Sequence, residues 1–419
     1  MHNRPSLPQF ILLVVLLTAA CAAPASAPEP SGATETTTEA TMGTIPNTAA
    51  PTANLTDSCV ENYNPAIDYF PEKVELTHTD GFSVAYHNNY KVITVDTPWP
   101  GAESAFAYVL VQCGTPAPEG YDAIQVIEVP AQSIATMSTS YLPFLDELDE
   151  LEKLVAIDDV TYVNNPTVQA MAKAGEVAQI GYGSGVNVEQ LLELDPDIIM
   201  TYGSGAPDYD AHPVLLNAGL HAVVNAEWLE TSPLGRAEWG KFIALFFNKE
   251  GMADAQFAAT AQHYEELAAQ AADVAVKPTV FTDSEYQGTW YIAGGNSFTA
   301  QYLEDAGAQY LWADDDSTGS IPLAFEAVYD IAAEADYWVN VGFLDSLAEL
   351  EAADARYADF AAFENDQVWN NNKQQNANGG NDYYESAVAN PDVVLADLIS
   401  IFHPELLPEH ETVYFQRLQ

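Results

Sequence analysis

The sequence predicts an α/β fold of two lobes joined by one long helix. Two stretches, residues 167–218 and 279–402, alternate short apolar segments of strand length with helical segments, a pattern typical of parallel α/β structure. Between them lies an Ala-rich segment, residues 251–274, whose larger side chains recur on one helical face. The recurring residues are Phe257, Ala261, Tyr264, Ala268 and Ala271. A helix of this length reaches roughly 36 Å, enough to cross from one lobe to another.

The first 21 residues have the features of an export signal. Arg4 gives a weakly basic start, and residues 10–17 form an apolar stretch that is too short to span a bilayer comfortably. The run ends in LTAAC, which resembles the lipobox of bacterial lipoproteins, where Cys21 would be lipidated. Thr18 departs from that pattern, because Leu, Val or Ile usually holds its place. Ordinary cleavage near residues 25–27 is the alternative, and either interpretation exports the chain.

Residues 22–57 are predicted to be a disordered tether. They consist largely of Ala, Pro, Ser, Thr and Glu with almost no large apolar residue, so they cannot bury enough surface to fold. A spacer without a role predicts the same composition. The expected boundaries after the tether are 58–250 for an N-terminal lobe with a β-rich opening, 251–276 for the linker helix and 277–419 for a C-terminal lobe.

The composition is strongly acidic. Among 419 residues, 61 are Asp or Glu and 12 are Lys or Arg, which gives a formal net charge of −49 and argues against nucleic acid as a partner. Attraction of cationic ligands is one interpretation, and a solvated surface suited to an exported or salt-exposed protein is the stronger one. After export the arginines left are Arg236, Arg356 and Arg417. Because arginine clusters often grip anionic chelates, a polyanionic ligand is disfavoured.

Cys59 and Cys113 are the cysteines that remain once Cys21 is assigned to the lipid. Both would lie in an oxidising extracytoplasmic compartment, where a disulfide between them would pin the start of the folded region to a strand near residues 107–112. Two free buried thiols are the alternative.

The folded part is expected to open with several strands and to continue as alternating strands and helices. The opening strands are residues 82–86, 90–96, 106–111 and 124–129. In the first lobe, helix 167–174, a strand at Ile180, helix 188–194, strand 198–202 and helix 214–218 follow. In the second lobe, the expected strands are 279–282 and 337–341 and the expected helices 297–306 and 391–402.

Residues 181–199, GYGSGVNVEQLLELDPDII, carry a resemblance to a known family. The segment is similar to the binding proteins of ABC importers for iron-siderophores, haem and cobalamin, in which N-x-E-x-(I/L)-x-x-L-x-P-D-(L/I)-(I/V) forms a helix and the next strand of the first lobe. This chain keeps every position of that pattern. The resemblance extends from about residue 126 to residue 402, whereas the opening segment 63–115 is poorly explained by it.

The resemblance implies a fold and a function. The fold would be two Rossmann-like α/β lobes joined by one long linker helix, with a ligand cleft between the lobes. The chain would capture an iron-siderophore or a related metal chelate outside the cytoplasm and deliver it to an ABC permease that works with a cytoplasmic ATPase. Cobalamin or haem binding by the same fold is an alternative, and an envelope lipoprotein such as a hydrolase is an alternative of a different class. We expect a monomer without a resident cofactor, held at the membrane through its lipid alone.

Two glutamates are candidates for contact with the permease. Asn187 can cap the helix that begins at Val188, and Pro196 stops it, but Glu189 has no packing duty there. In the resembled family, one exposed glutamate on each lobe pairs with permease arginines, and Glu189 matches the first-lobe position. Glu326, ahead of a similar helix and strand, would be its second-lobe counterpart. A solvated surface position is the alternative for both.

Ligand contacts are expected at the carboxyl ends of the strands, where small-molecule sites of open α/β sheets form. Aromatic and amide side chains there suit a large, partly apolar chelate. The first-lobe candidates are Ser140 and Tyr141 within residues 138–141, Tyr182, Tyr202 within residues 202–204, and Trp228. The second-lobe candidates are Tyr286, Trp290, and Trp369 and Asn370 within residues 369–372. Core packing is the alternative for each aromatic residue.

Other chemistry is weakly represented in the sequence. The turn at residues 181–185 lacks the Lys-Ser/Thr of a phosphate loop and the spacing of a dinucleotide fingerprint. The histidines show no close pair at metal-ligand spacing, so no metal site is predicted, although a site built from carboxylates is an alternative. No Gly-x-Ser-x-Gly elbow or acid pair at a meaningful spacing is present. The sequence therefore predicts a binding protein and not an enzyme.

Overall fold

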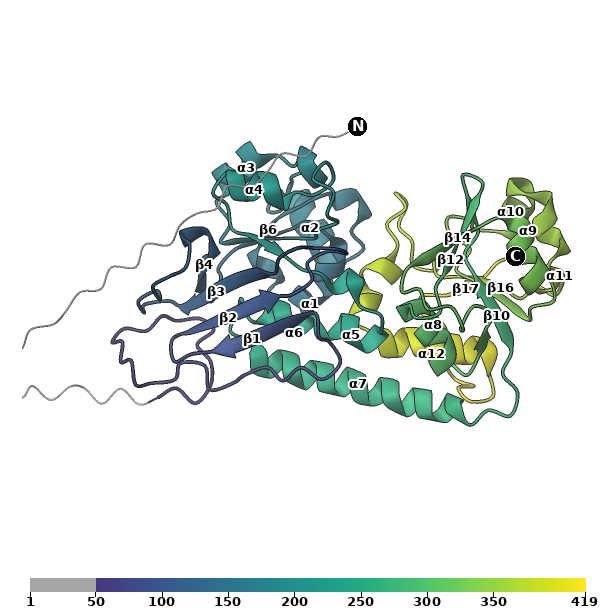
Figure 1. Ribbon diagram of the computed structural model, residues 1–419, viewed down its shortest axis with the longest axis horizontal. Coiled ribbons are helices and arrows are strands. Elements are labelled where there is room, and N and C mark those ends of the chain that lie inside the picture. Colours follow the sequence, from purple (N-terminus) through teal and green to yellow (C-terminus); the bar gives the residue numbers. More distant parts are fainter. Residues whose placement is uncertain (1–49) are drawn as a thin grey trace, which may run out of the picture. The chain divides into compact units, whose positions relative to one another are not determined.

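The computed structural model describes residues 50–419, so the predicted signal peptide, Cys21 and most of the predicted tether lie outside the described residues. The described part opens with a four-stranded sheet in the order β1-β2-β3-β4 (Figure 1). Its strands are β1 (Phe82–Tyr86), β2 (Tyr90–Val95), β3 (Phe106–Gln112) and β4 (Val126–Val129). Strands β1 to β3 are antiparallel, and β4 runs parallel to β3. The four predicted strands are confirmed, except that the last one starts two residues late because Asp122 and Gln125 cap a short 3-10 turn ahead of it.

The first lobe contains a five-stranded parallel sheet in the order β7-β6-β5-β8-β9. The strands are β5 (Ile134–Thr136), β6 (Leu154–Ile157), β7 (Ala178–Gln179), β8 (Ile198–Thr201) and β9 (Ala222–Val224). The helices of this lobe are α1 (Leu142–Glu147), α2 (Pro166–Ala174), α3 (Val188–Leu194), α4 (His212–Asn217), α5 (Pro233–Glu238) and α6 (Gly240–Ala244). All residues of β5, β8 and β9 are buried, as in a sheet covered on both faces.

The long helix α7 (Glu250–Ala272) follows the first lobe and packs against α6 and α12 (Pro391–Phe402) (Figure 1). Its buried face contains Phe257, Ala261, Tyr264 and Ala271, as predicted. Leu267 is also buried and takes the place that the periodicity gave to Ala268, which is only partly buried. The helix thus contacts α6 of the first lobe at one end and α12 of the second lobe.

The second lobe has a five-stranded sheet in the order β13-β10-β15-β16-β17, with only the edge strand β17 antiparallel. The strands are β10 (Thr279–Thr282), β13 (Gln309–Tyr310), β15 (Tyr337–Val339), β16 (Val368–Asn370) and β17 (Gln416–Arg417). A smaller antiparallel sheet joins β11 (Glu285–Tyr286), β12 (Thr289–Ala293) and β14 (Ser320–Leu323). The remaining helices are α8 (Phe298–Asp305), α9 (Phe325–Ala332), α10 (Leu347–Ala353) and α11 (Ala361–Glu364).

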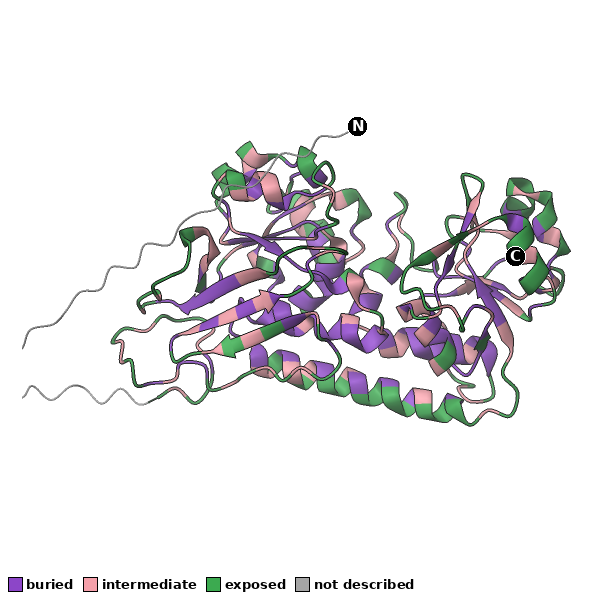
Figure 2. Cartoon of the chain, viewed as in Figure 1, coloured by how far each residue is buried: buried purple, intermediate pink, exposed green. Residues whose placement is uncertain are grey.

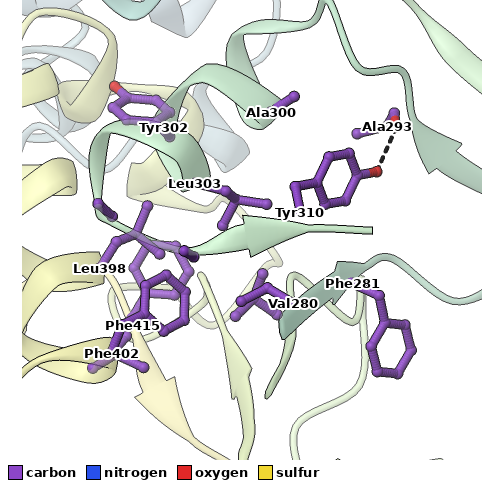
Figure 3. Packing of buried hydrophobic residues seen from close by; sticks show 14 of the residues in the cluster. Val280, Phe281, Ala293, Ala300, Tyr302, Leu303, Tyr310, Leu398, Phe402 and Phe415 are labelled. Carbon is purple, nitrogen blue, oxygen red and sulfur yellow. Dashed lines mark hydrogen bonds between the residues drawn. The ribbon is translucent and has the colours of Figure 1, made fainter. Parts of the chain in front are cut away.

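The N-terminal sheet shares a hydrophobic core with the first lobe. Ile93, Tyr108 and Ile127 of the sheet pack in one cluster with Ile134 and Phe242 of the lobe. Figure 2 shows the buried parts of the chain in purple. The second lobe has a separate core, in which Val280 comes from β10, Leu303 from α8, Phe402 from α12 and Phe415 from the segment just before β17 (Figure 3). The β-rich opening is therefore an integral part of the first lobe.

The described chain makes specific contacts before the predicted end of the tether. Asn54 is buried, and its Nδ2 donates to the carbonyl oxygen of Glu72 at 2.9 Å and to Oε2 of Glu250 at 2.8 Å. The predicted boundary at residue 57 is therefore too late, because a single buried amide fixes a segment whose composition alone indicates disorder. A disulfide joins Cys59 to Cys113, directly after β3.

A buried ion pair connects the N-terminal sheet to the start of α7. Lys91 on β2 has a fully buried side chain whose Nζ contacts Oε1 of Glu250 and donates to Oδ1 of Asn248 at 3.0 Å. Desolvation lowers the pKa of Lys91, and the Glu250 carboxylate opposes that shift. The acid lies in the first turn of α7, where the helix dipole favours a negative charge.

Removing one partner of this pair is expected to destabilise the protein strongly. Lys91→Met leaves the Glu250 carboxylate buried without its cation, so the free energy of unfolding in urea should fall by roughly 3–5 kcal/mol. Lys73→Met is the matched control, because Lys73 forms an exposed pair with Asp68 and its loss should cost less than about 1 kcal/mol. Equal stability of the two variants would show that the buried pair has no such role.

Candidate functional site

Both parallel sheets have a switch point where the strand order reverses. In the first lobe it lies between β5 and β8, and in the second between β10 and β15. Ligands of open α/β sheets bind outside the carboxyl ends of the strands at such points. Residues that follow these strands, Thr139 after β5, Asp283 after β10 and Asn340 after β15, line two neighbouring cavities.

The two cavities contain side chains from both lobes. The larger, of about 460 Å³, is lined by Pro100, Trp228, Leu229, Glu230, Asp283, Ala293, Ser297, Phe298, Thr299, Thr318, Gly319, Ser320, Asn340, Asn371, Tyr383 and Tyr384. The smaller, of about 360 Å³, is lined by Thr139, Tyr162, Gly342, Phe343, Asn371, Asn372, Gln375, Gly379, Gly380, Asn381 and Tyr384. Asn371 and Tyr384 line both cavities, which we therefore treat as one ligand cleft. Its lining is mainly aromatic rings, amides and hydroxyls.

Two residues at the second-lobe switch point adopt left-handed backbone conformations. The φ angles of Asp283 and Asn340 are +66° and +60°. Such angles are uncommon for residues other than glycine, and they gather at functional sites because the surrounding structure must hold them there. Oδ1 of Asn340 is buried without a hydrogen-bond partner among the described residues. Asn340 lines the larger cavity, and its side-chain oxygen is an acceptor that the described residues leave unpaired.

Asp283 is poised to titrate near neutral pH. Desolvation raises its pKa to about 6, although Thr282 Oγ1 donates to its Oδ2 at 2.7 Å and favours the ionised form. Asp283 is one of the residues that line the larger cavity. The cleft therefore contains an acid whose charge changes between pH 5 and pH 7, according to that pKa.

On the first lobe, a buried hydrogen-bond network joins Ser140, Glu227 and Arg236. Ser140 Oγ donates to Glu227 Oε1 at 2.9 Å, and Arg236 donates to Glu227 Oε2 through Nε at 2.8 Å. The Arg236 guanidinium also covers the ring of Phe298, 4.9 Å from its centroid. Desolvation alone would lower the pKa of Arg236, but the Glu227 carboxylate outweighs it and raises that pKa. Arg236 is therefore neutralised within the protein and is not a free anion-binding cation.

The predicted ligand residues fall into four groups. Trp228 lines the larger cavity and is 41% exposed. Tyr202 is half-buried after β8, and Ser140 is tied to Glu227, so both lie at the carboxyl edge of the first sheet without lining a cavity. Tyr182 and Tyr286 are exposed and line neither cavity. Within the predicted segments 138–141 and 369–372, Thr139, Asn371 and Asn372 are the residues that line the cleft.

The side chains of the other four candidates pack inside the protein. Tyr141 is buried in the first-lobe core and Trp290 in the second-lobe core, where its Nε1 donates to the carbonyl oxygen of Thr282 at 2.9 Å. Asn370 is buried, and its Nδ2 donates to the carbonyl oxygen of Gly342 at 2.8 Å. Trp369 packs against the second-lobe core. In this structure, Tyr141, Trp290 and Asn370 are structural residues. Trp290 and Asn370 lie on strands, where successive side chains point to opposite faces, and Tyr141 ends a 3-10 helix with its ring in the core.

Sequence reasoning missed several residues that line the cleft. These are Pro100, Tyr162, Asp283, Phe298, Asn340, Phe343, Tyr383 and Tyr384. A signal was available for two of them, because Asp283 and Asn340 each follow directly after a short apolar strand of the second lobe. Pro100 had no such signal, since it belongs to the opening sheet.

The two predicted docking glutamates occupy equivalent positions. Glu189 is exposed in the first turn of α3, and Glu326 is 76% exposed in the first turn of α9. The two sites differ in one respect. Glu326 already contacts Arg356 at 3.1 Å, and the guanidinium of Arg356 lies 3.8 Å from the centroid of the Phe325 ring.

Residues 50–419 contain neither a cluster of metal ligands nor a helix that could cross a membrane. Within that range, no group of three or more His, Cys, Asp or Glu side chains is arranged to hold a metal ion. None of the helices in the same range is long and apolar enough to cross a membrane.

Comparisons with known proteins agree with this geometry. Residues 134–374 match the periplasmic binding protein family. An uncharacterized lipoprotein of Methanocaldococcus jannaschii is 28% identical over 251 residues, which are 58% of this chain and 56% of that protein. The chain thus matches a little over half the length of this relative.

Solved structures share the fold at low identity. A possible iron-binding periplasmic solute-binding protein from Staphylococcus epidermidis is 18% identical, with 65% of this chain and 99% of that chain covered and a TM-score of 0.52. A periplasmic heme-binding protein from Pseudomonas aeruginosa is 20% identical, with 69% and 98% covered and a TM-score of 0.52. Both the family and these neighbours are binding proteins and not enzymes. With more than half of its residues matched, this chain belongs to the periplasmic binding protein family.

Proposed function

We propose that this chain is the extracytoplasmic substrate-binding component of an ABC importer, and that it captures an iron-siderophore or a related metal chelate. The observation that carries the proposal is the cleft at the switch points of both sheets, lined by aromatic rings and amides from the two lobes. Rings offer a bulky chelate a large contact area, and amides offer hydrogen bonds to its polar edge. The described residues have no cluster of metal ligands, which favours a chelated metal over a bare one.

Delivery would follow capture by a modest closure of the lobes. The helix α7 packs against elements of both lobes and resists wide hinging. Two cross-lobe contacts add to this restraint, since the Glu385 carboxylate accepts hydrogen bonds from the backbone N–H groups of Asn164 and Asn165, each at 2.7 Å. The loaded protein would then dock both lobes on a permease that works with a cytoplasmic ATPase. A lipid on Cys21 would keep it close to that permease.

Two other functions are tested by the same experiment. Solved structures of this fold include a heme-binding protein, a complex with Ni-His and a protein of an Fe³⁺-hydroxamate transport system, so haem is an alternative cargo for the same cleft. Cobalamin is another alternative, which the sequence resemblance implies. An envelope lipoprotein with a different role would bind none of these. The test is a titration of intrinsic Trp fluorescence with ferric siderophores, haem, cobalamin and divalent metals, combined with mass spectrometry of whatever co-purifies. Saturable quenching by one chelate supports the proposal, and silence across the panel contradicts it.

Loss of both docking acids is expected to lower uptake without lowering affinity. In Glu189→Ala/Glu326→Ala, the dissociation constant of the bound chelate should change less than about twofold, since neither residue lines the cleft, whereas uptake should fall by about tenfold or more. Uptake is measured in a strain that lacks other binding proteins.

The control for this experiment changes other exposed acids on the same two helices. Glu193 lies in the last turn of α3, and Asp330 lies further along α9. Glu193→Ala/Asp330→Ala removes the same charge and should leave uptake within about twofold of the wild-type rate. Equal uptake by the two double variants would reject the docking assignment.

A further inference from the structure

The loop between β2 and β3 contains a rigid turn at residues 99–102. The N–H of Ala102 donates to the carbonyl oxygen of Trp99 at 3.1 Å, and Gly101 has a φ of +77°. Pro100 stands at the second position of this turn and Gly101 at the third, which is the sequence of a type II turn. Pro restricts φ and Gly supplies the left-handed residue, so the turn fixes the direction of the Pro100 ring locally.

The side chain of Trp99 packs this turn against the first lobe. Its ring stacks on His212 with the centroids 5.1 Å apart and meets Phe106 edge-on at 5.7 Å. Two glycines that follow β8 also lie against the Trp99 ring. A Cβ on Gly203 would lie 2.6 Å from the Trp99 ring, and one on Gly205 would lie 2.7 Å from it. The missing side chains of Gly203 and Gly205 therefore leave the space that Trp99 fills.

The sheet that carries the turn is fixed to the first lobe. The backbone N–H of Val224, at the end of β9, donates to the Tyr108 hydroxyl on β3 at 2.7 Å. Ala131, which follows β4, donates its N–H to the carbonyl oxygen of Phe246 at 2.8 Å. These two contacts fix the sheet, and with it the turn, relative to the first-lobe switch point. The turn is therefore a fixed wall and not a mobile lid.

Pro100 projects from this turn into the ligand cleft. It is exposed and lines the larger cavity, together with Trp228 and Leu229 of the first lobe and residues 318–320 of the second. The part of the chain that matches the periplasmic binding protein family begins at residue 134. Pro100 therefore belongs to a wall that the family's two lobes do not contribute.

We propose that the Trp99–Pro100 turn is a specificity-determining wall of the ligand cleft, supplied by the N-terminal sheet. The inference rests on the proposed function, because it assigns a role within the same cleft. Pro100 and Trp228 both line the larger cavity. Their apolar surfaces take an apolar part of the chelate, and the wall limits its size on that side.

The first test is protection of a cysteine from alkylation. Pro100→Cys is made in the chain from Ala22 onward, and Ser104→Cys, exposed in the same loop but outside the cavity lining, is its control. The ferric trihydroxamate, haem or cobalamin that saturably quenches Trp fluorescence is then added. We expect this ligand to slow maleimide alkylation of Cys at position 100 by about tenfold and to leave position 104 within about twofold.

Two results would overturn the proposal in distinguishable ways. Unchanged alkylation at position 100 under saturating ligand would remove the wall and leave the proposed function standing. No saturable quenching by any of the three probes would remove the wall together with the proposed function.

The second test displaces the Trp99–Pro100 turn without substituting any of its own residues. Gly203→Ala places a methyl group where the Trp99 ring lies, whereas Gly185→Ala adds one in open space. If the wall sets specificity, Gly203→Ala should change the ratio of the dissociation constants for the ferric trihydroxamate and cobalamin by about tenfold, and Gly185→Ala should keep it. Thermal unfolding of both variants separates a general loss of stability from this change. An unchanged ratio in Gly203→Ala would refute the role.

Discussion

A linear ferric trihydroxamate with a free terminal ammonium group is expected to bind about tenfold or more tightly than the same chelate capped with a succinyl group. The residues that line the two cavities include Glu230 and Asp283 but no Lys, Arg or His. The nearby Arg236 is paired with Glu227 at 2.7 Å, so it offers no free charge to an anion. The cleft therefore has a negative potential within a chain whose formal net charge is −49.

The comparison uses one chelate in three charge states. The ammonium form, its uncharged N-acetyl derivative and the succinyl derivative share the same iron centre, so differences in their dissociation constants report charge. The preference for the ammonium form should shrink between about 0.05 M and 1 M NaCl, because the Debye length falls from above 10 Å to about 3 Å. A succinyl derivative that binds as tightly as the ammonium form would refute the electrostatic argument while leaving chelate binding intact.

Asp283→Asn and pH test the same point by another route. Since burial raises the pKa of Asp283 to about 6, the carboxylate is charged at pH 7.5 and neutral at pH 5. The preference for the ammonium form should therefore be larger at pH 7.5 than at pH 5 in the wild type. In Asp283→Asn, a much smaller dependence on pH is expected. Glu266→Gln is the control, because Glu266 is exposed on α7 and lies outside the cleft.

The elements with local signals were predictable from the sequence. Helix α3 has the bounds expected, because Asn187 accepts a hydrogen bond from the backbone N–H of Gln190 and residues 195 and 196 end the helix. Strand β10 and helix α12 also have the bounds expected from apolar runs and a flanking proline. These elements follow from capping and periodicity, both of which are properties of neighbouring residues.

The ligand cleft was less predictable, because its lining depends on which residue of a short turn faces outward. The segment 369–372 was chosen correctly, yet Asn370 is buried whereas Asn371 and Asn372 line the cleft. Trp290 looked suitable for stacking on a ligand and is the centre of an aromatic core with Trp338 and Phe360. Nothing local separates an aromatic ring that packs from one that binds, since both uses reward the same apolar surface.

The Pro100 wall could not be predicted, because it depends on contacts between residues distant in sequence. Trp99 reaches Gly203 and His212 across more than a hundred positions, and Tyr108 receives a hydrogen bond from Val224. The opening strands were recognised and assigned to the N-terminal lobe, but the residues that attach them to it were not identified. Short-range sequence patterns predict the helices and strands. Which other element each of them packs against is decided by tertiary packing alone.

Salt and mild acid are each expected to stabilise the folded protein. Several of the few cations are consumed in ion pairs whose cationic side chains are at most 16% exposed, namely those of Lys91, Lys153, Arg236, Lys241 and Lys249. The remaining surface therefore carries a large excess of carboxylates, whose mutual repulsion is screened by ions. Raising NaCl from 0.1 M to 1 M should increase the free energy of unfolding by several kcal/mol. A decrease would contradict this account of the charge.

The effect of acid follows from carboxyl groups that the fold desolvates. Burial raises the pKa of Glu147 and Glu385 to about 7 and that of Asp158 and Asp283 to about 6. The folded state therefore takes up these protons at a higher pH than the unfolded state, whose carboxyl groups titrate near pH 4. Stability should rise as the pH falls from about 7.5 to 5, and the gain should end as the unfolded chain also becomes protonated.

Asp158→Asn separates this effect from general charge repulsion. Oδ1 of Asp158 is buried without a hydrogen-bond partner among the described residues, so the charge there is a cost to the folded state at neutral pH. The substitution should stabilise the protein by on the order of 1–2 kcal/mol at pH 8 and by little at pH 5, where the wild-type carboxyl group is already neutral. Asp149→Asn, at an exposed turn, should show no such difference between the two pH values. Urea unfolding at both pH values gives the result, and an equal effect of Asp158→Asn at pH 8 and pH 5 would mean that its carboxyl group does not titrate in this range.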